Sequence, residues 1–135
     1  MTSDVEQLAS RLNGDWRALL RARVNVLVVG PEDIQEAFRN ACRDEVRPPV
    51  ACVLVGTPLL LPWASTLVLV DVERLDGAGQ SALACWMNDP RNADAQIISF
   101  TSTSLYPFVL SGQFDRALYY RLNTIHLRLT EATTH

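Results

Sequence analysis

The chain has 135 residues, with 15 acidic and 12 basic side chains and a net charge of −3. All of its basic residues are arginine, and lysine is absent. This length suits one domain, and the acidic balance lacks the basic patch expected for direct nucleic-acid binding. No apolar run approaches the roughly 20 residues of a membrane span, so we expect a cytoplasmic domain without membrane contact.

Five short runs rich in valine, isoleucine or leucine predict strands. The runs are Val24–Val29, Val50–Val55, Leu67–Val72, Gln96–Phe100 and Thr124–Leu129. Several are continuously apolar, which is typical of strands that are covered on both faces. The sheet is therefore expected to be mainly parallel.

Helical periodicity occurs before the first of these runs and between several of them. The expected helices are residues 4–23, broken at Asn13-Gly14 and recapped by Asp15, and then Asp33–Glu45, Gly79–Asn88 and Phe114–Leu122. This alternation predicts an α/β three-layer sandwich with right-handed crossovers. We expect one domain over residues 1–135, with a helical segment at 1–23 and the α/β core at 24–129.

The segment Gly56–Ser65 joins the second and third predicted strands, and its two prolines discourage a helix. It holds a dense apolar cluster of Leu59, Leu60, Leu61 and Trp63. Exposed apolar clusters with a tryptophan are typical of protein interfaces, so these four residues are a candidate partner surface. The alternative is that the segment folds back over the edge of the sheet.

The segment Gly112–Asn123 reads G-Q-F-D-R-A-L-Y-Y-R-L-N. It resembles the G-x-F-R-x-D-L-Y-Y-R-L-N signature of the ATPase domain of sigma-54-dependent transcriptional activators. Weaker similarities in the same order occur at Val26–Gly30, Thr66–Leu69 and Ile97–Ser102. The resemblance implies a five-stranded sheet of the P-loop NTPase (AAA+) type, here expected without the family's helical lid.

The phosphate-binding loop of such an ATPase reads G-x-x-x-x-G-K-[ST]. In this chain Gly30 keeps the first glycine, but Glu36 stands at the lysine position and Ala37 at the hydroxyl position. Glu32, Asp33 and Glu36 would face the triphosphate. One like-charge contact at about 4 Å costs about 4 kcal/mol at an effective dielectric constant of about 20. We therefore expect no nucleotide cofactor and no ATPase activity.

Other family positions are also altered. Val70 stands where the resemblance places the magnesium-holding aspartate, and Asp71 where it places the catalytic glutamate. Ser102 replaces the sensor asparagine. Asp115 replaces the first arginine of the family motif, whereas Arg121 keeps the second, which in the family serves a neighbouring subunit's nucleotide. We expect Arg121 to pair with a local carboxylate such as Asp115.

The G-A-F-T-G-A loop, which contacts the sigma factor in the family, has no counterpart here. We therefore expect a non-catalytic relative that acts by protein–protein interaction, with itself or with an intact activator, in transcription regulation. Its oligomeric state is left open. The three cysteines are expected to be free thiols, and no metal-ligand spacing occurs, so no metal is expected.

Three alternatives stay open. A receiver-like signalling domain would use Asp71 as phosphoacceptor, with Glu32, Asp33 and Thr101 around it, but the chain has no lysine for the end of the fifth strand. An ATPase-type domain could bind nucleotide without hydrolysing it. A hydrolase could use Asp71, Thr101 and Ser102, although no nucleophile motif accompanies them.

Overall fold

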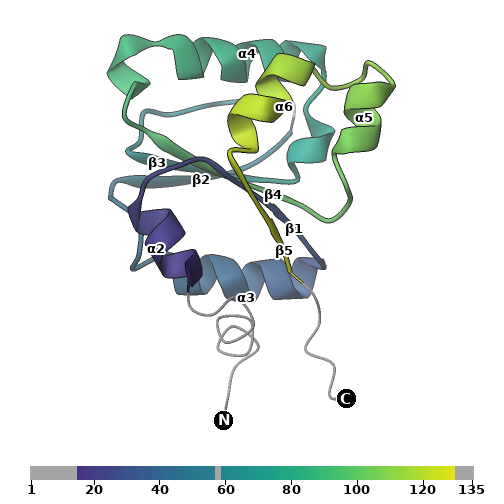
Figure 1. Cartoon of the computed structure of the whole chain (residues 1–135). Helices are drawn as coiled ribbons and strands as arrows, with labels where there is room; N and C mark the ends of the chain where they lie inside the picture. The colour runs from purple at the N-terminus through teal and green to yellow at the C-terminus, as the bar shows by residue number, and fades with distance from the viewer. Residues whose placement is uncertain (1–14, 57–58, 130–135) are drawn as a thin grey trace, which may run out of the picture.

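The computed structural model describes residues 15–56 and 59–129. A parallel sheet of five strands lies between two helical layers (Figure 1). The strands are β1 (Val26–Val29), β2 (Val50–Leu54), β3 (Thr66–Val70), β4 (Gln96–Thr101) and β5 (Ile125–Arg128). Their order across the sheet is β2-β3-β4-β1-β5, and all neighbouring pairs are parallel. The expected three-layer α/β sandwich is confirmed.

The helices divide between the two faces of the sheet (Figure 1). One face carries α2 (Asp15–Arg21) and α3 (Glu32–Cys42), and the other carries α4 (Gly77–Asn88), α5 (Tyr106–Leu110) and α6 (Arg116–Leu122). Short 3₁₀ turns, η1 (Val72–Arg74) and η2 (Pro90–Asn92), follow β3 and α4. In the described part of the chain, no helix is long and apolar enough to cross a membrane.

Each face of the sheet has its own apolar core. On the α2–α3 side, the ring of Phe38 lies 5.1 Å from Trp16 and 6.3 Å from Phe100, measured between centroids. On the other side, Leu83, Leu118 and Leu122 pack against the sheet. Both faces of the central strands are therefore buried, which explains the nearly uninterrupted apolar sequences of β1 and β3.

Aspartate side chains cap the amino ends of two of the helices. Asp76 Oδ1 accepts a hydrogen bond of 2.7 Å from the Gly79 amide at the start of α4. Asp115 Oδ2 accepts one of 2.8 Å from the Leu118 amide at the start of α6. Each carboxylate satisfies an amide that has no partner within its helix.

The observed elements differ from the sequence predictions at several ends. β3 ends at Val70 because Asp71 adopts a left-handed conformation, with φ of 63°. The helix α5 is not anticipated, since it is short and has a proline in its first turn. Between β2 and β3 no helix occurs in the described residues, as expected. The expected helix over residues 4–13 lies outside the described residues.

Candidate functional site

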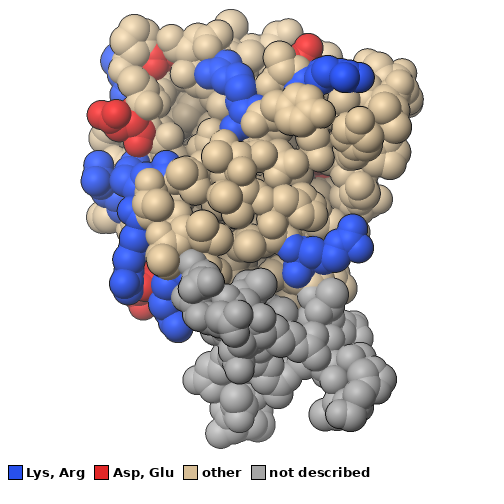
Figure 2. Space-filling view, in the orientation of Figure 1, with Lys and Arg blue, Asp and Glu red and all other residues tan. Residues whose placement is uncertain are grey.

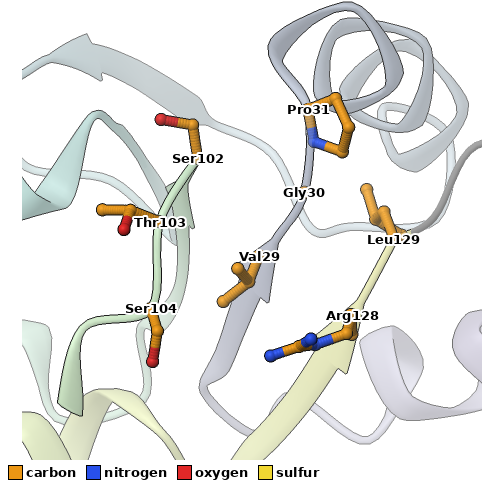
Figure 3. Close-up of a pocket in the computed structure, with 8 residues that line it drawn as sticks. All are labelled: Val29, Gly30, Pro31, Ser102, Thr103, Ser104, Arg128 and Leu129. Carbon is orange, nitrogen blue, oxygen red and sulfur yellow. The ribbon is translucent and has the colours of Figure 1, made fainter. Parts of the chain in front are cut away.

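The carboxyl ends of β1, β4 and β5 border an open depression of about 520 Å³ (Figure 3). It is lined by Val29, Gly30, Pro31, Ser102, Thr103, Ser104, Arg128 and Leu129. Ligands of open parallel sheets bind outside the carboxyl ends of the strands, where connections diverge to opposite faces. This depression is therefore where a nucleotide site would be sought.

The connection from β1 to α3 consists of Gly30 and Pro31 alone. The Gly30 amide donates to the Thr101 carbonyl oxygen at 3.1 Å. Its own carbonyl oxygen accepts from Gln35 Nε2 at 2.7 Å. A phosphate-cradling loop presents several successive backbone amides, but here one amide is engaged and proline has none.

Gly30 has a packing role. A Cβ atom at this position would lie 2.7 Å from Leu129 Cβ and 2.8 Å from the Leu129 carbonyl oxygen. The Leu129 amide in turn donates to the Val29 carbonyl oxygen at 2.7 Å. The close approach of the chain after β5 thus accounts for a glycine at the end of β1.

The charges around the β1–α3 connection are unfavourable for an anion. Glu32, Asp33 and Glu36 are exposed on the first turns of α3, and Ala37 is half-buried against the α3-side core. Arg128 is the basic residue among those that line the depression. In Figure 3 its side chain extends from β5 toward the segment that carries Ser104.

The depression brings together two of the sequence-predicted site residues and leaves the others apart. Gly30 and Ser102 line the depression because they follow adjacent strands, β1 and β4. Glu36, Ala37, Val70, Asp71 and Arg121 are not among its lining residues. Val70 is buried, and Asp71 is half-buried beyond the end of β3. Thr101, named in two of the alternatives, bonds locally: its hydroxyl donates to the Thr103 carbonyl at 2.9 Å.

Arg121 lies near the amino ends of β1 and β5, at the opposite end of the strands from the depression. It lines a pocket of about 310 Å³ together with Asn25, Trp86 and Asn92. Its carbonyl oxygen accepts from Asn25 Nδ2 at 2.9 Å. The predicted ion pair between Arg121 and Asp115 is not among the ion pairs of the described residues, because the Asp115 carboxylate caps α6 instead.

The candidate partner surface of Leu59, Leu60, Leu61 and Trp63 is only partly exposed. Leu59 and Leu61 are half-buried and pack against the α4-side core. Leu60 and Trp63 are 74% and 60% exposed. The Pro62 carbonyl oxygen accepts from Trp86 Nε1 at 3.1 Å, which holds the segment against α4. The segment therefore folds back on the molecule and leaves two of its four side chains outside.

Sequence reasoning did not identify three residues that line the depression. Thr103, Ser104 and Arg128 belong to no recognised motif. The available signal is positional, because Thr103 and Ser104 follow β4 and Arg128 ends β5, so parallel strands bring them to one edge. Among the described residues, no group of three or more histidine, cysteine, aspartate or glutamate side chains could hold a metal ion.

The sheet order and the two helical layers define an AAA+ type P-loop NTPase fold. NtrX from Brucella abortus in complex with ADP superposes with a TM-score of 0.77 at 16% identity, over 96% of this chain and 37% of that one. Its complex with ATP gives 0.74 at 17% identity, over 91% and 37%. AMPPCP-bound DnaA from Aquifex aeolicus gives 0.54 at 17% identity, over 96% and 48%. These likenesses concern the fold alone, and the chain spans little more than a third of NtrX.

The model of the sigma-54 interaction domain matches residues 63–131, just over half of the chain. The chain belongs to this family. The matched segment runs from the β2–β3 connection through β5, and so includes Asp71, Ser102 and Arg121. It leaves out Gly30, Glu36 and Ala37, the residues of the altered phosphate loop. A search of curated proteins gives no significant match.

Proposed function

We propose that this sigma-54 interaction domain does not bind or hydrolyse ATP at the β1–α3 connection and acts through protein–protein interaction in the regulation of transcription. The observation that carries the proposal is the two-residue connection between β1 and α3. It leaves no room for a loop that wraps phosphates, and three exposed carboxylates follow it. A domain of this family that works in transcription would act in the cytoplasm.

Electrostatics support the same proposal. A phosphate-loop lysine supplies positive charge to the triphosphate, and the following hydroxyl holds magnesium. Here the side chains nearest in sequence are Glu32, Asp33 and Glu36, each of which would repel the ligand. Because all three are exposed, water and salt screen the repulsion below the ~4 kcal/mol per contact that an effective dielectric constant of about 20 gives. The missing attraction of the lysine therefore lowers the affinity for ATP more than the repulsion by the three carboxylates does.

The proposed partner is an intact sigma-54 activator or a second copy of this chain. Tyr106, Leu110 and Tyr120, which we call the α5–α6 surface, are 40%, 63% and 54% exposed. Tyr119 links the two helices, with ring centroids 5.9 Å from Tyr106 and 5.2 Å from Tyr120. Exposed aromatic side chains on a rigid support are typical interface anchors. This surface lies within the matched family segment.

The mass of the protein in solution tests the interaction. Light scattering is measured for the protein alone and mixed with an intact activator of the same bacterium. We expect a dimer or a mixed complex that Leu110→Asp abolishes. Leu54→Asp is the matched control, because Leu54 is 65% exposed on the edge strand β2, away from α5 and α6. A monomeric mass in both samples would contradict the proposal.

Nucleotide binding without hydrolysis is the second candidate. The depression of about 520 Å³ persists between β1, β4 and β5, with Ser102, Ser104 and Arg128 as polar lining residues. Titration of the unaltered protein with magnesium and ATP separates the two candidates, because only the second predicts saturable binding. The double substitution Glu36→Lys with Ala37→Thr then tests what the site lacks. If only the lysine and hydroxyl were missing, it would restore ATP binding. We expect no restoration, because the two-residue connection still lacks the phosphate loop.

A further inference from the structure

Another charged pocket lies at the amino ends of the strands, at the opposite end of the sheet from the depression in Figure 3. Its volume is about 240 Å³. The residues that matter here are Arg23, Arg47, Trp63, Ser65, Arg91 and Asp94. They come from four places along the chain: the start of β1, the start of β2, the start of β3, and the turn before β4. Figure 2 shows arginine side chains gathered along the side of the molecule where α2 lies in Figure 1.

Arg23 is held in place but is not fully satisfied. Its Nη2 donates to the carbonyl oxygens of Ser65 at 2.8 Å and Asp94 at 2.7 Å. Its Nη1 is buried and has no hydrogen-bond partner among the described residues. A buried donor without a partner costs about 1–3 kcal/mol. Arg23 also has φ of 61°, a left-handed conformation that costs a non-glycine residue roughly 1 kcal/mol.

The positive charge in this pocket is incompletely balanced. Burial, and then the charge of Arg47, lowers the pKa of Arg23, whereas Asp94 raises it. Asp89 holds Arg91 through contacts of 2.7 and 3.2 Å. Arg47 is exposed and forms no ion pair with the described carboxylates. Asp94 is thus the carboxylate among the lining residues, against the positive charges of Arg23 and Arg47.

Trp63 provides a flat wall beside these guanidinium groups. It is 60% exposed, whereas Trp16 and Trp86 are 1% and 9% exposed. Its Nε1 donates to the Arg91 carbonyl oxygen at 3.4 Å, which fixes one edge of the indole. An exposed tryptophan face can stack on a planar ring. The pocket therefore combines an unsatisfied donor, excess positive charge and an apolar wall.

We propose that this pocket binds a phosphate group, carried by a ligand whose flat ring stacks on Trp63. A phosphate in the pocket can accept from the fork of the exposed Arg47 beside the charge of Arg23, and guanidinium groups suit such bidentate contacts. The bound group would relieve the repulsion between the two arginines. It would also tie the starts of β1, β2 and β3 together. The pocket lies apart from the β1–α3 connection, so this inference is independent of the proposed function.

The test uses calorimetry at constant ionic strength with the full chain. The probes are phenyl phosphate, inorganic phosphate and benzoate, which carries the same ring on a carboxylate. We expect phenyl phosphate to bind at least tenfold more tightly than either of the others. Arg47→Gln should weaken it at least tenfold, while Arg74→Gln should not, because Arg74 is exposed beyond the opposite end of β3. Trp63→Leu should bring phenyl phosphate down to the affinity of inorganic phosphate.

Several results would overturn the proposal. They are no saturable heat from phenyl phosphate, equal affinity for benzoate, or equal binding by the Arg47→Gln and Arg74→Gln proteins. Binding of a glutamate-rich peptide with none of phenyl phosphate would assign the pocket to a protein segment instead. A general rise in melting temperature does not count as support, because phosphate salts stabilise folded proteins by exclusion from the surface. The two arginine variants remove that ambiguity.

Discussion

Substitution of Gly30 by alanine separates a packing role for this glycine from a phosphate-binding role. The added Cβ would lie 2.7 Å from Leu129 Cβ and 2.8 Å from the Leu129 carbonyl oxygen, so backbone must move. Overpacking of this kind costs about 1–3 kcal/mol. Loss of glycine's freedom in the unfolded chain offsets about 0.4–1 kcal/mol. We therefore expect a net loss of about 1–2 kcal/mol in the free energy of unfolding.

Urea unfolding followed by circular dichroism measures this loss, which corresponds to a fall of roughly 3–8 °C in melting temperature. Gly77→Ala is the matched control, because a Cβ there meets nothing within 4 Å and Gly77 opens helix α4. The control should be neutral or more stable by up to about 1 kcal/mol. If Gly30→Ala were as stable as Gly77→Ala, the close approach of Leu129 would not explain the glycine.

Two further predictions concern stability. Burial, with a smaller effect of Glu45, raises the pKa of the Cys42 thiol to about 12 from 9.0. The thiol is neutral in the folded protein, so its contribution is complete below pH 9 and is lost as the pH rises toward 12. Between pH 8 and 10 the free energy of unfolding should fall by about 1.4 kcal/mol more than in Cys42→Ala. An equal loss in both proteins, by urea titration, would contradict this. Asp115→Ala should cost about 1 kcal/mol, because the Leu118 amide loses its cap, whereas Asp115→Asn should cost less. Equal melting temperatures for the two Asp115 variants would argue against the cap.

The parallel sheet could be predicted from sequence because its central strands are buried on both faces. β1 and β3 are buried on both faces, so their apolar runs are nearly continuous and indicate parallel pairing. β2 has a similar sequence, yet it is an edge strand whose exposure alternates, and Leu54 is 65% exposed. Nothing local distinguishes an edge strand from a central one, because that depends on which strands pair.

The candidate site was only partly predictable. Alignment to the family motif assigns Glu36 to the lysine position, but α3 begins at Glu32, four residues earlier. Most of the positions that align with the family's phosphate-binding loop are therefore already part of helix α3 in this chain. The arginine pocket could not be foreseen, since Arg23, Arg47 and Arg91 are far apart in sequence. They meet because the amino ends of parallel strands lie at the same end of the sheet.

The central claim, that the phosphate-binding site has been lost, is tested most directly by calorimetric titration with magnesium and ATP. Were a site occupied at 100 times its dissociation constant, the fold would be stabilised by about 2.7 kcal/mol, so a thermal melt at millimolar nucleotide supports the titration. The Arg47→Gln protein is titrated in parallel, which identifies any phosphate contact at the amino ends of the strands. We predict that Arg47→Gln shows no saturable heat and no thermal shift. Stoichiometric ATP binding that persists in Arg47→Gln would contradict the account.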